Sequence, residues 1–171
     1  IFRSDSVPAL FQRLMESLRG RLRNLPLRSV TDGAIAHARR RLGVRPFRLF
    51  FRAVAQRTIC THRFHGFRLK GIDGVRLDVP DTPANVQAFG RPSGSRGPSA
   101  YSQILAVPLL DLVTRAPLDV KFATYKGSER ACAERLLRSV DEEDILLLDR
   151  GFFGLPLFRA IRARDAHFLC R

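Results

Sequence analysis

Two aspartates stand where their residue types and surroundings could support chemistry. Asp149 directly follows the unbroken apolar run 145–148, ILLL. Such a run is typical of a strand in the middle of a parallel region, and ligands bind at the carboxyl ends of strands of that kind. Asp73 lies in an alternating segment, where it shares a face with Leu69 and Val75, so we expect it to point toward the covered side of a sheet. Burying an unpaired carboxylate lowers folding stability by an amount on the order of several kcal/mol, so Asp73 needs a cation, a hydrogen-bond shell or a functional site.

The two aspartates could act together if their strands are neighbours, because they would then face one another. Two close carboxylates repel unless a positive charge lies between them, and a divalent metal ion is the usual solution. Oxygen ligands favour Mg²⁺ or Mn²⁺ over zinc. Two such ions about 4 Å apart can activate a water or a 3′-hydroxyl and stabilise the leaving oxygen in phosphodiester transfer. The alternative for a single aspartate at a strand end is a turn or cap role, and two of them in these positions favour the metal site.

Other polar groups have simpler interpretations. Asp111 lies inside a predicted hairpin strand and is expected to face solvent. The acidic run 141–144, DEED, is expected to be a solvated connection from a helix to a strand. Cys60, His62 and His65 lie close together, but their spacing fits no zinc pattern.

The hydrophobic pattern predicts which elements position the aspartates. Strands are expected in 64–81, in 101–125 as a hairpin, at 145–148 and from 166; helices are expected at 127–140 and 154–164. Three early strands followed by alternating helices and strands predict a mixed α/β sheet flanked by helices. This order resembles that of the ribonuclease H-like fold, left incomplete at the C-terminal end.

The first part of the chain reads as basic helices. Apolar residues recur at helical spacing in 8–25, 31–43 forms a capped amphipathic pattern, and Pro46 suits the first turn of a third helix. The last two helices carry the arginines that we expect to contact DNA as a helix-turn-helix: Arg39, Arg40, Arg41, Arg45, Arg48 and Arg52. The alternative is an ordinary helical hairpin with a solvated basic face.

Charge is distributed unevenly along the chain. The formal net charge is +14, and residues 1–70 hold +13 of it, from sixteen basic and three acidic residues. Such a field attracts polyanions, and guanidinium groups suit bidentate phosphate contacts. We therefore expect a helical DNA-binding region at 1–63 and a separate domain at 64–171. No apolar run spans a membrane, and three scattered cysteines favour a reducing interior, so we expect a cytoplasmic, nucleoid-associated protein.

Two segments resemble the DDE transposases of the insertion-element-four type. They are GIDGVRLDVPDTPANVQAFG, residues 71–90, and LLLDRGFFGLPLF, residues 146–158. Val75 stands where threonine is common in that family, and residues 30–56 resemble its small N-terminal helical domain. The resemblance implies that Asp73 and Asp149 are the first two members of a DDE triad that binds Mg²⁺ or Mn²⁺. Arg150, which we also expect to contact DNA, and Phe152 complete the motif around the second.

The resemblance also implies an activity and its partners. Family members cut and rejoin double-stranded DNA at element ends and target sites, so metal-dependent strand cleavage and strand transfer, by a homodimer on DNA, are expected. The third member of the triad is a glutamate in a downstream segment that also carries tyrosine, arginine and lysine, and residues 1–171 contain no such segment. We therefore expect residues 1–171 alone to be inactive, and a robust strand-transfer assay would contradict this. The alternative is a non-catalytic basic DNA-binding protein that uses the N-terminal helices.

Overall fold

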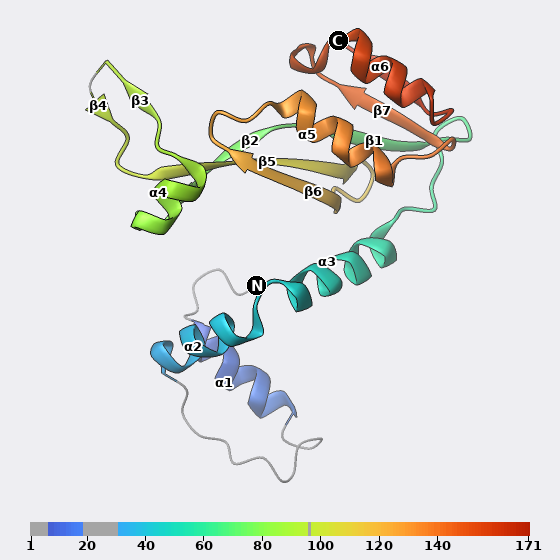
Figure 1. The fold of residues 1–171 in the computed structure, drawn as a ribbon. Coiled ribbons are helices and arrows are strands. Elements are labelled where there is room, and N and C mark those ends of the chain that lie inside the picture. Colours follow the sequence, from blue (N-terminus) through green and yellow to red (C-terminus); the bar gives the residue numbers. More distant parts are fainter. Residues whose placement is uncertain (1–6, 19–30, 96) are drawn as a thin grey trace. The chain divides into compact units, whose positions relative to one another are not determined.

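The structure is a computed structural model that describes residues 7–18, 31–95 and 97–171 (Figure 1). The chain divides into two compact units, Ile1–Phe50 and Phe51–Arg171. The boundary expected from the sequence, between residues 63 and 64, stays a prediction. In the described part of the chain, no helix has the length and apolarity needed to cross a bilayer.

The N-terminal unit consists of helices whose ends follow the capping signals of the sequence. Helix α1 spans Val7–Leu18, α2 spans Asp32–Leu42, and α3 begins in this unit and spans Arg45–Thr58. The Thr31 hydroxyl accepts a hydrogen bond from the Ala34 amide at 3.2 Å and starts α2. Gly43 ends α2 with a φ of 67°, which favours glycine. The second half of the helix expected over 8–25 lies outside the described residues.

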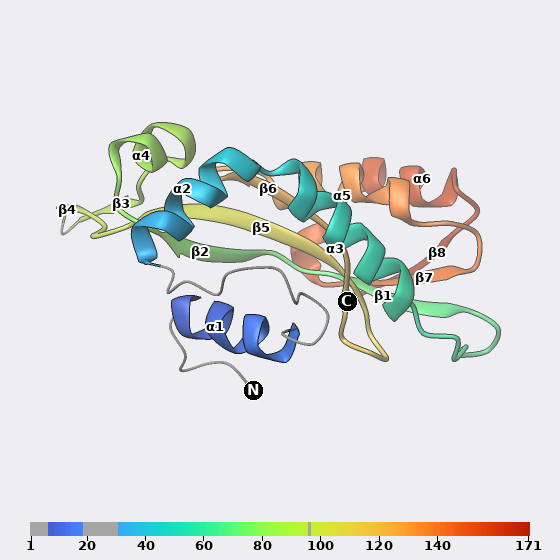
Figure 2. The same cartoon turned by 90° about the horizontal axis from the view of Figure 1, so that it is seen from below.

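The sheet of the C-terminal unit is organised around one long strand that breaks at Asp73 and Gly74. Strands β1 (Arg68–Ile72) and β2 (Val75–Val79) both pair antiparallel with β5 (Ser102–Asp111). They keep a single register across the break, since Ile72 pairs with Leu109 and Val75 pairs with Ala106. Figure 2 shows β5 running beside both. The two short strands are therefore one strand with a two-residue interruption.

Three further strands complete a mixed sheet. Strand β6 (Pro117–Thr124) pairs antiparallel with β5, whereas β7 (Asp144–Leu148) runs parallel to β1 and β8 (His167–Cys170) runs parallel to β7. With β1 and β2 counted as one, the spatial order is third, second, first, fourth, fifth. This order, with only the second strand antiparallel to the first, is that of a ribonuclease H-like sheet, so the predicted fold class is confirmed.

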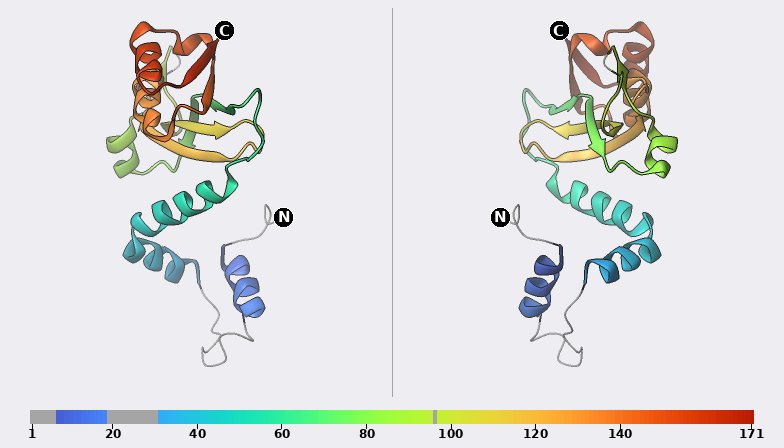
Figure 3. Two further views of the ribbon diagram at one scale, coloured as in Figure 1. Left: turned by 90° about the vertical axis from the view of Figure 1, so that its right-hand side faces the viewer. Right: turned by 90° about the vertical axis from the view of Figure 1, so that its left-hand side faces the viewer.

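Two helices cover one face of this sheet. They are α5 (Glu129–Leu136), continued by the 3-10 turn η1 (Leu137–Ser139), and α6 (Leu155–Arg162). Figure 3 shows them on the same side of the strands. Between helices and strands lies the core: Ile72, Leu105, Val107, Leu109, Ala133, Leu136, Leu146, Leu148, Phe152, Leu157 and Ile161 are all buried. The core thus fixes α5 and α6 over the strands that end at Asp73 and Asp149.

Three short elements between β2 and β5 were not anticipated. Helix α4 spans Pro83–Phe89, and strands β3 (Ser93–Gly94) and β4 (Gly97–Pro98) form a small hairpin. A sequence signal for α4 exists, because Thr82 accepts a hydrogen bond from the Asn85 amide and Pro83 occupies the first turn.

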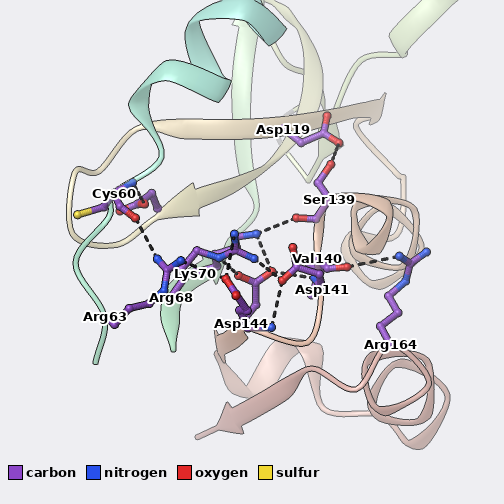
Figure 4. A network of polar contacts seen from close by, with 12 residues as sticks. Cys60, Arg63, Arg68, Lys70, Asp119, Ser139, Val140, Asp141, Asp144 and Arg164 are labelled. Carbon is purple, nitrogen blue, oxygen red and sulfur yellow. Dashed lines mark hydrogen bonds and ion pairs between the residues drawn. The ribbon is translucent and has the colours of Figure 1, made fainter. Parts of the chain in front are cut away.

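The amino ends of β1 and β7 are joined by a buried charge network (Figure 4). Asp144 is fully buried and accepts hydrogen bonds from Lys70 Nζ at 2.6 Å and Arg68 Nε at 2.8 Å. Lys70 is only 5% exposed and also donates to the Ser139 carbonyl. The expectation that the whole DEED run is solvated was therefore wrong for Asp144. Its carboxylate can be buried because two cationic side chains, Lys70 and Arg68, neutralise it.

Asp111 also differs from expectation. It is 3% exposed and ends β5, and its carboxylate accepts backbone N–H bonds from Cys60, Val113 and Thr114. Solvent exposure was expected because the residue lies within a hairpin. The carboxylate instead organises the turn after β5 and fastens the segment that follows α3 to the sheet unit.

Acidification is expected to destabilise the C-terminal unit. Burial of Asp111 and Asp119 opposes their ionisation and by itself would raise each pKa. Backbone N–H donors to Asp111, and Arg138 and Ser139 as donors to Asp119, outweigh this effect and hold each pKa below its ordinary value. A lowered pKa contributes stability above the unfolded-state pKa, and that stability is lost as pH falls through the folded-state pKa. Urea unfolding should therefore give a constant free energy from neutrality down to about pH 5 and a falling one below about pH 4. Asp119→Asn should reduce this dependence, and an unchanged pH profile in the variant would contradict the assignment.

Candidate active site at the carboxyl edge of the sheet

Asp73 lies directly after β1, in the break of the long strand. Its Oδ1 accepts a hydrogen bond from the Gly74 amide at 2.7 Å, and the residue is exposed. The expectation that it points to the covered face was wrong. The alternation was correct, but the helices cover the opposite face, where Ile72 is buried, while Val75 is 46% exposed.

Asp149 lies directly after β7 and caps the 3-10 turn η2, which spans Arg150–Phe152. Its Oδ1 accepts a hydrogen bond from the Gly151 amide at 2.9 Å. Phe152 is fully buried and fixes the turn to the core, while Asp149 itself is exposed. The apolar strand thus delivers a carboxylate to the surface on a turn that the core holds in place.

The parallel pairing of β1 and β7 brings the two aspartates together. Arg68 pairs with Asp144 and Gly71 with Leu147, so each residue of β1 lies beside the residue 76 positions later. Continuing this register by two residues places Asp73 beside Asp149, at the carboxyl end of both strands. Paired strands lie about 4.8 Å apart, and residues in register on parallel strands share a face. The structure therefore assigns both aspartates to one edge and one face of the sheet.

The electrostatics of this edge fit a hard cation. In each aspartate one oxygen is engaged by its own loop, and for the other the described part of the chain supplies no hydrogen-bond donor. Neither carboxylate forms an ion pair with a described residue. Two adjacent carboxylates without a counter-charge favour a divalent cation between them. Within residues 7–18, 31–95 and 97–171, no group of three His, Cys, Asp or Glu side chains is placed to hold a metal.

The arginines expected to contact DNA are all exposed. Arg39, Arg40 and Arg41 end α2, Arg45, Arg48 and Arg52 lie on α3, and Arg150 lies in η2 beside Asp149. None of them forms an ion pair with another residue that the structure describes. Their guanidinium groups are therefore free to meet a polyanion.

Two residues of this edge were not singled out from the sequence. Glu129 and Arg130 form the first turn of α5, where Glu129 packs on Gly74 and Arg130 bonds the Gly151 carbonyl. Local sequence identifies Glu129 only as an acidic residue near a helix start. Its contact with the aspartate loops depends on how α5 packs, which local sequence does not reveal.

Comparison with known proteins relates the segment that forms this sheet to a family. The family model described as "Transposase DDE domain" matches residues 68–171, from the first residue of β1 onward, and so includes both aspartates. The chain belongs to this family. The transposase DDE domain here is accompanied by an N-terminal segment, residues 1–67, that the family model does not match.

Two relatives of this DDE-domain chain come from Escherichia coli K12. The transposase InsG of insertion sequence element IS4 is 34% identical over 141 residues, which are 81% of this chain and 32% of InsG. The InsZ protein is 27% identical over 139 residues, 78% of this chain and 46% of InsZ. The chain thus spans one third to one half of these relatives, and the resemblance to transposases of the insertion-element-four type is confirmed. The Mos1 transposase paired-end complex with the left transposon end is 12% identical, with a TM-score of 0.40, over 98% of this chain and 55% of that one.

Proposed function

We propose that this chain carries the first two metal-binding carboxylates of a DNA transposase that cuts DNA at the ends of an insertion element and joins it to a target. The observation that supports the proposal most directly is the register that aligns Asp73 with Asp149 at the carboxyl edge of β1 and β7. Family membership and the two unpaired carboxylates support it further.

The roles of the chain's own groups follow from their positions. Asp73 and Asp149 would hold Mg²⁺ or Mn²⁺ through the oxygens that their loops leave free. The bound metal would supply activation of the attacking oxygen and stabilisation of the leaving oxygen in phosphodiester chemistry. Arg150, next to Asp149 and exposed, is positioned to contact a phosphate of the DNA. The protein would work on double-stranded DNA as a homodimer, associated with the nucleoid.

Calorimetric titration of residues 1–171 with MnCl₂ tests the metal part of the proposal. We expect binding that Mg²⁺ competes for and that EDTA reverses, because hard carboxylate ligands do not discriminate strongly between these ions. A chain that takes up neither ion, yet binds DNA equally well with and without EDTA, would overturn the proposal and favour a non-catalytic basic DNA-binding protein.

Removing charge from α2 is expected to weaken DNA binding and its dependence on salt. Each phosphate contact contributes about 0.9 to the slope of log K against log salt concentration, so Arg40→Ala with Arg41→Ala should reduce the slope by up to about 2. Fluorescence anisotropy of a labelled duplex at several salt concentrations measures this. The matched control is Arg135→Ala with Arg159→Ala, which removes the same charge from exposed positions on α5 and α6. Equal slopes for the two variants would contradict a DNA-binding role of the N-terminal helices.

A further inference from the structure

We propose that the first turn of α5 is a strut that holds the Asp73 loop and the Asp149 loop in their mutual register, with Arg130 and Glu129 as positioning residues. The proposal rests on the proposed function, because it concerns the geometry of the same pair of carboxylates. It assigns roles to two side chains that are not themselves placed to share a metal ion with the aspartates.

Arg130 connects α5 to the Asp149 loop. Its Nε donates a hydrogen bond to the Gly151 carbonyl at 2.9 Å. The amide of the same glycine donates to Asp149 Oδ1 at 2.9 Å. Gly151 is therefore bonded on one side to the aspartate and on the other to the helix. Movement of Arg130 would be transmitted to the carboxylate through a single residue.

Glu129 connects the same turn to the Asp73 loop. A Cβ placed on Gly74 would lie 2.8 Å from both Cγ and Oε1 of Glu129, so the glutamate packs directly on the glycine backbone. The φ of Gly74 lies outside the left-handed region, so backbone conformation does not require a glycine here. The close approach of Glu129 does, because it leaves no room for a Cβ. Glu129 also pairs with Arg76 of β2 at 3.7 Å, on the far side of the strand break. Gly74 in the break and Arg76 just beyond it are thus both in contact with one side chain of α5.

The helix is itself fixed, which is what a strut requires. Ser128 caps it by accepting a hydrogen bond from the Ala131 amide. Cys132, Ala133 and Leu136 are buried in the core. The first turn is therefore an extension of the core that reaches both loops, while the aspartates remain exposed on the opposite face of the sheet.

The first test needs no metal, because amide hydrogen exchange followed by NMR reports on the loops directly. Arg130→Ala removes a charge-assisted hydrogen bond, so exchange at Gly151 should accelerate about tenfold. Arg130→Lys, which keeps a charged donor, should recover at least part of the protection. Arg135→Ala is the matched control on the same helix and should leave Gly151 unchanged. Exchange at Gly151 that is equal in wild type and Arg130→Ala would overturn the strut.

The second test measures Mn²⁺ affinity by calorimetry. Substitutions behind metal ligands typically cost about tenfold to a hundredfold in affinity, and we expect about tenfold for Arg130→Ala. Gly74→Ala should also weaken binding, because the added methyl group displaces Glu129 from the Asp73 loop. Glu129→Ala should weaken binding by a similar factor, and the double variant should lose little more affinity than either single variant, which a double-mutant cycle detects.

The two tests separate failure of the strut from failure of the proposed function. If Asp73→Asn and Asp149→Asn weaken Mn²⁺ binding while Arg130→Ala and Gly74→Ala bind like wild type, the strut is wrong and the metal site stands. If the wild-type chain takes up no Mn²⁺, the proposed function fails, and the exchange rate at Gly151 still decides whether the strut exists.

Discussion

Replacing Asp144 by alanine is expected to lower the free energy of unfolding by about 3–5 kcal/mol, because a buried charge is left without its partner. Lys70 would remain 5% exposed, and only the Ser139 carbonyl would accept a hydrogen bond from it. Arg68 would lose one of the two carboxylates that accept its hydrogen bonds. Urea unfolding followed by tyrosine fluorescence measures the loss. Both tyrosines, Tyr101 and Tyr125, lie in the C-terminal unit, so the signal reports on that unit.

Two variants show whether burial is the cause. Asp141→Ala removes an exposed partner of the same Arg68, and such surface pairs contribute about 0–1 kcal/mol, so it should be nearly neutral. The double variant Lys70→Met with Asp144→Leu replaces the buried pair by apolar groups and should cost less than Asp144→Ala alone. A loss below about 1 kcal/mol for Asp144→Ala would show that Lys70 does not depend on it.

Asp73→Asn and Asp149→Asn are each expected to weaken Mn²⁺ binding at least about a hundredfold. Replacing a residue that only hydrogen-bonds to a metal ligand already lowers metal affinity about 10–100-fold, and these two residues would be ligands themselves. Asparagine keeps an oxygen that can accept the Gly151 or Gly74 amide bond, so the loops should stay in place and only the charge is lost. Calorimetric titration with MnCl₂ measures the effect, and Asp78→Asn, a neighbouring exposed carboxylate on β2, is the matched control.

The free energy of unfolding of the same two variants provides an independent check. Without metal, two adjacent carboxylates repel, so removing either charge should leave the free energy of unfolding unchanged or slightly higher. With saturating Mn²⁺ the order should reverse, because bound metal stabilises only the folded chain that can hold it. Metal affinity equal to wild type in both variants would refute the assignment of the aspartates.

The local signals of the sequence predict much of this site. A Thr and a Gly at the two ends of α2, and the apolar run before Asp149, each correspond to an observed boundary. Both aspartates end strands that pair in parallel, the arrangement implied by the resemblance to a ribonuclease H-like fold. These features depend on a few neighbouring residues, which is why pattern alone finds them.

The side of the sheet that carries each residue could not be predicted in the same way. Alternation in β1 separates Lys70 from Asp73 correctly but does not say which face the helices cover. Lys70 carries a charge and is nevertheless on the covered face, because Asp144, 74 residues away, neutralises it. The contacts of Glu129 and Arg130 are hidden for the same reason, since they depend on tertiary packing.

The most direct measurement of the central claim is the line broadening of backbone amide NMR signals on addition of Mn²⁺ to residues 1–171. A paramagnetic ion broadens the amides nearest to it, so its position is read along the whole chain. If Asp73 and Asp149 hold the ion together, the amides of Gly74 and Gly151 should broaden first and in parallel, and both should stay sharp in Asp149→Asn. Broadening centred instead on the exposed acidic residues 141–143, or at only one of the two glycines, would contradict a shared metal site.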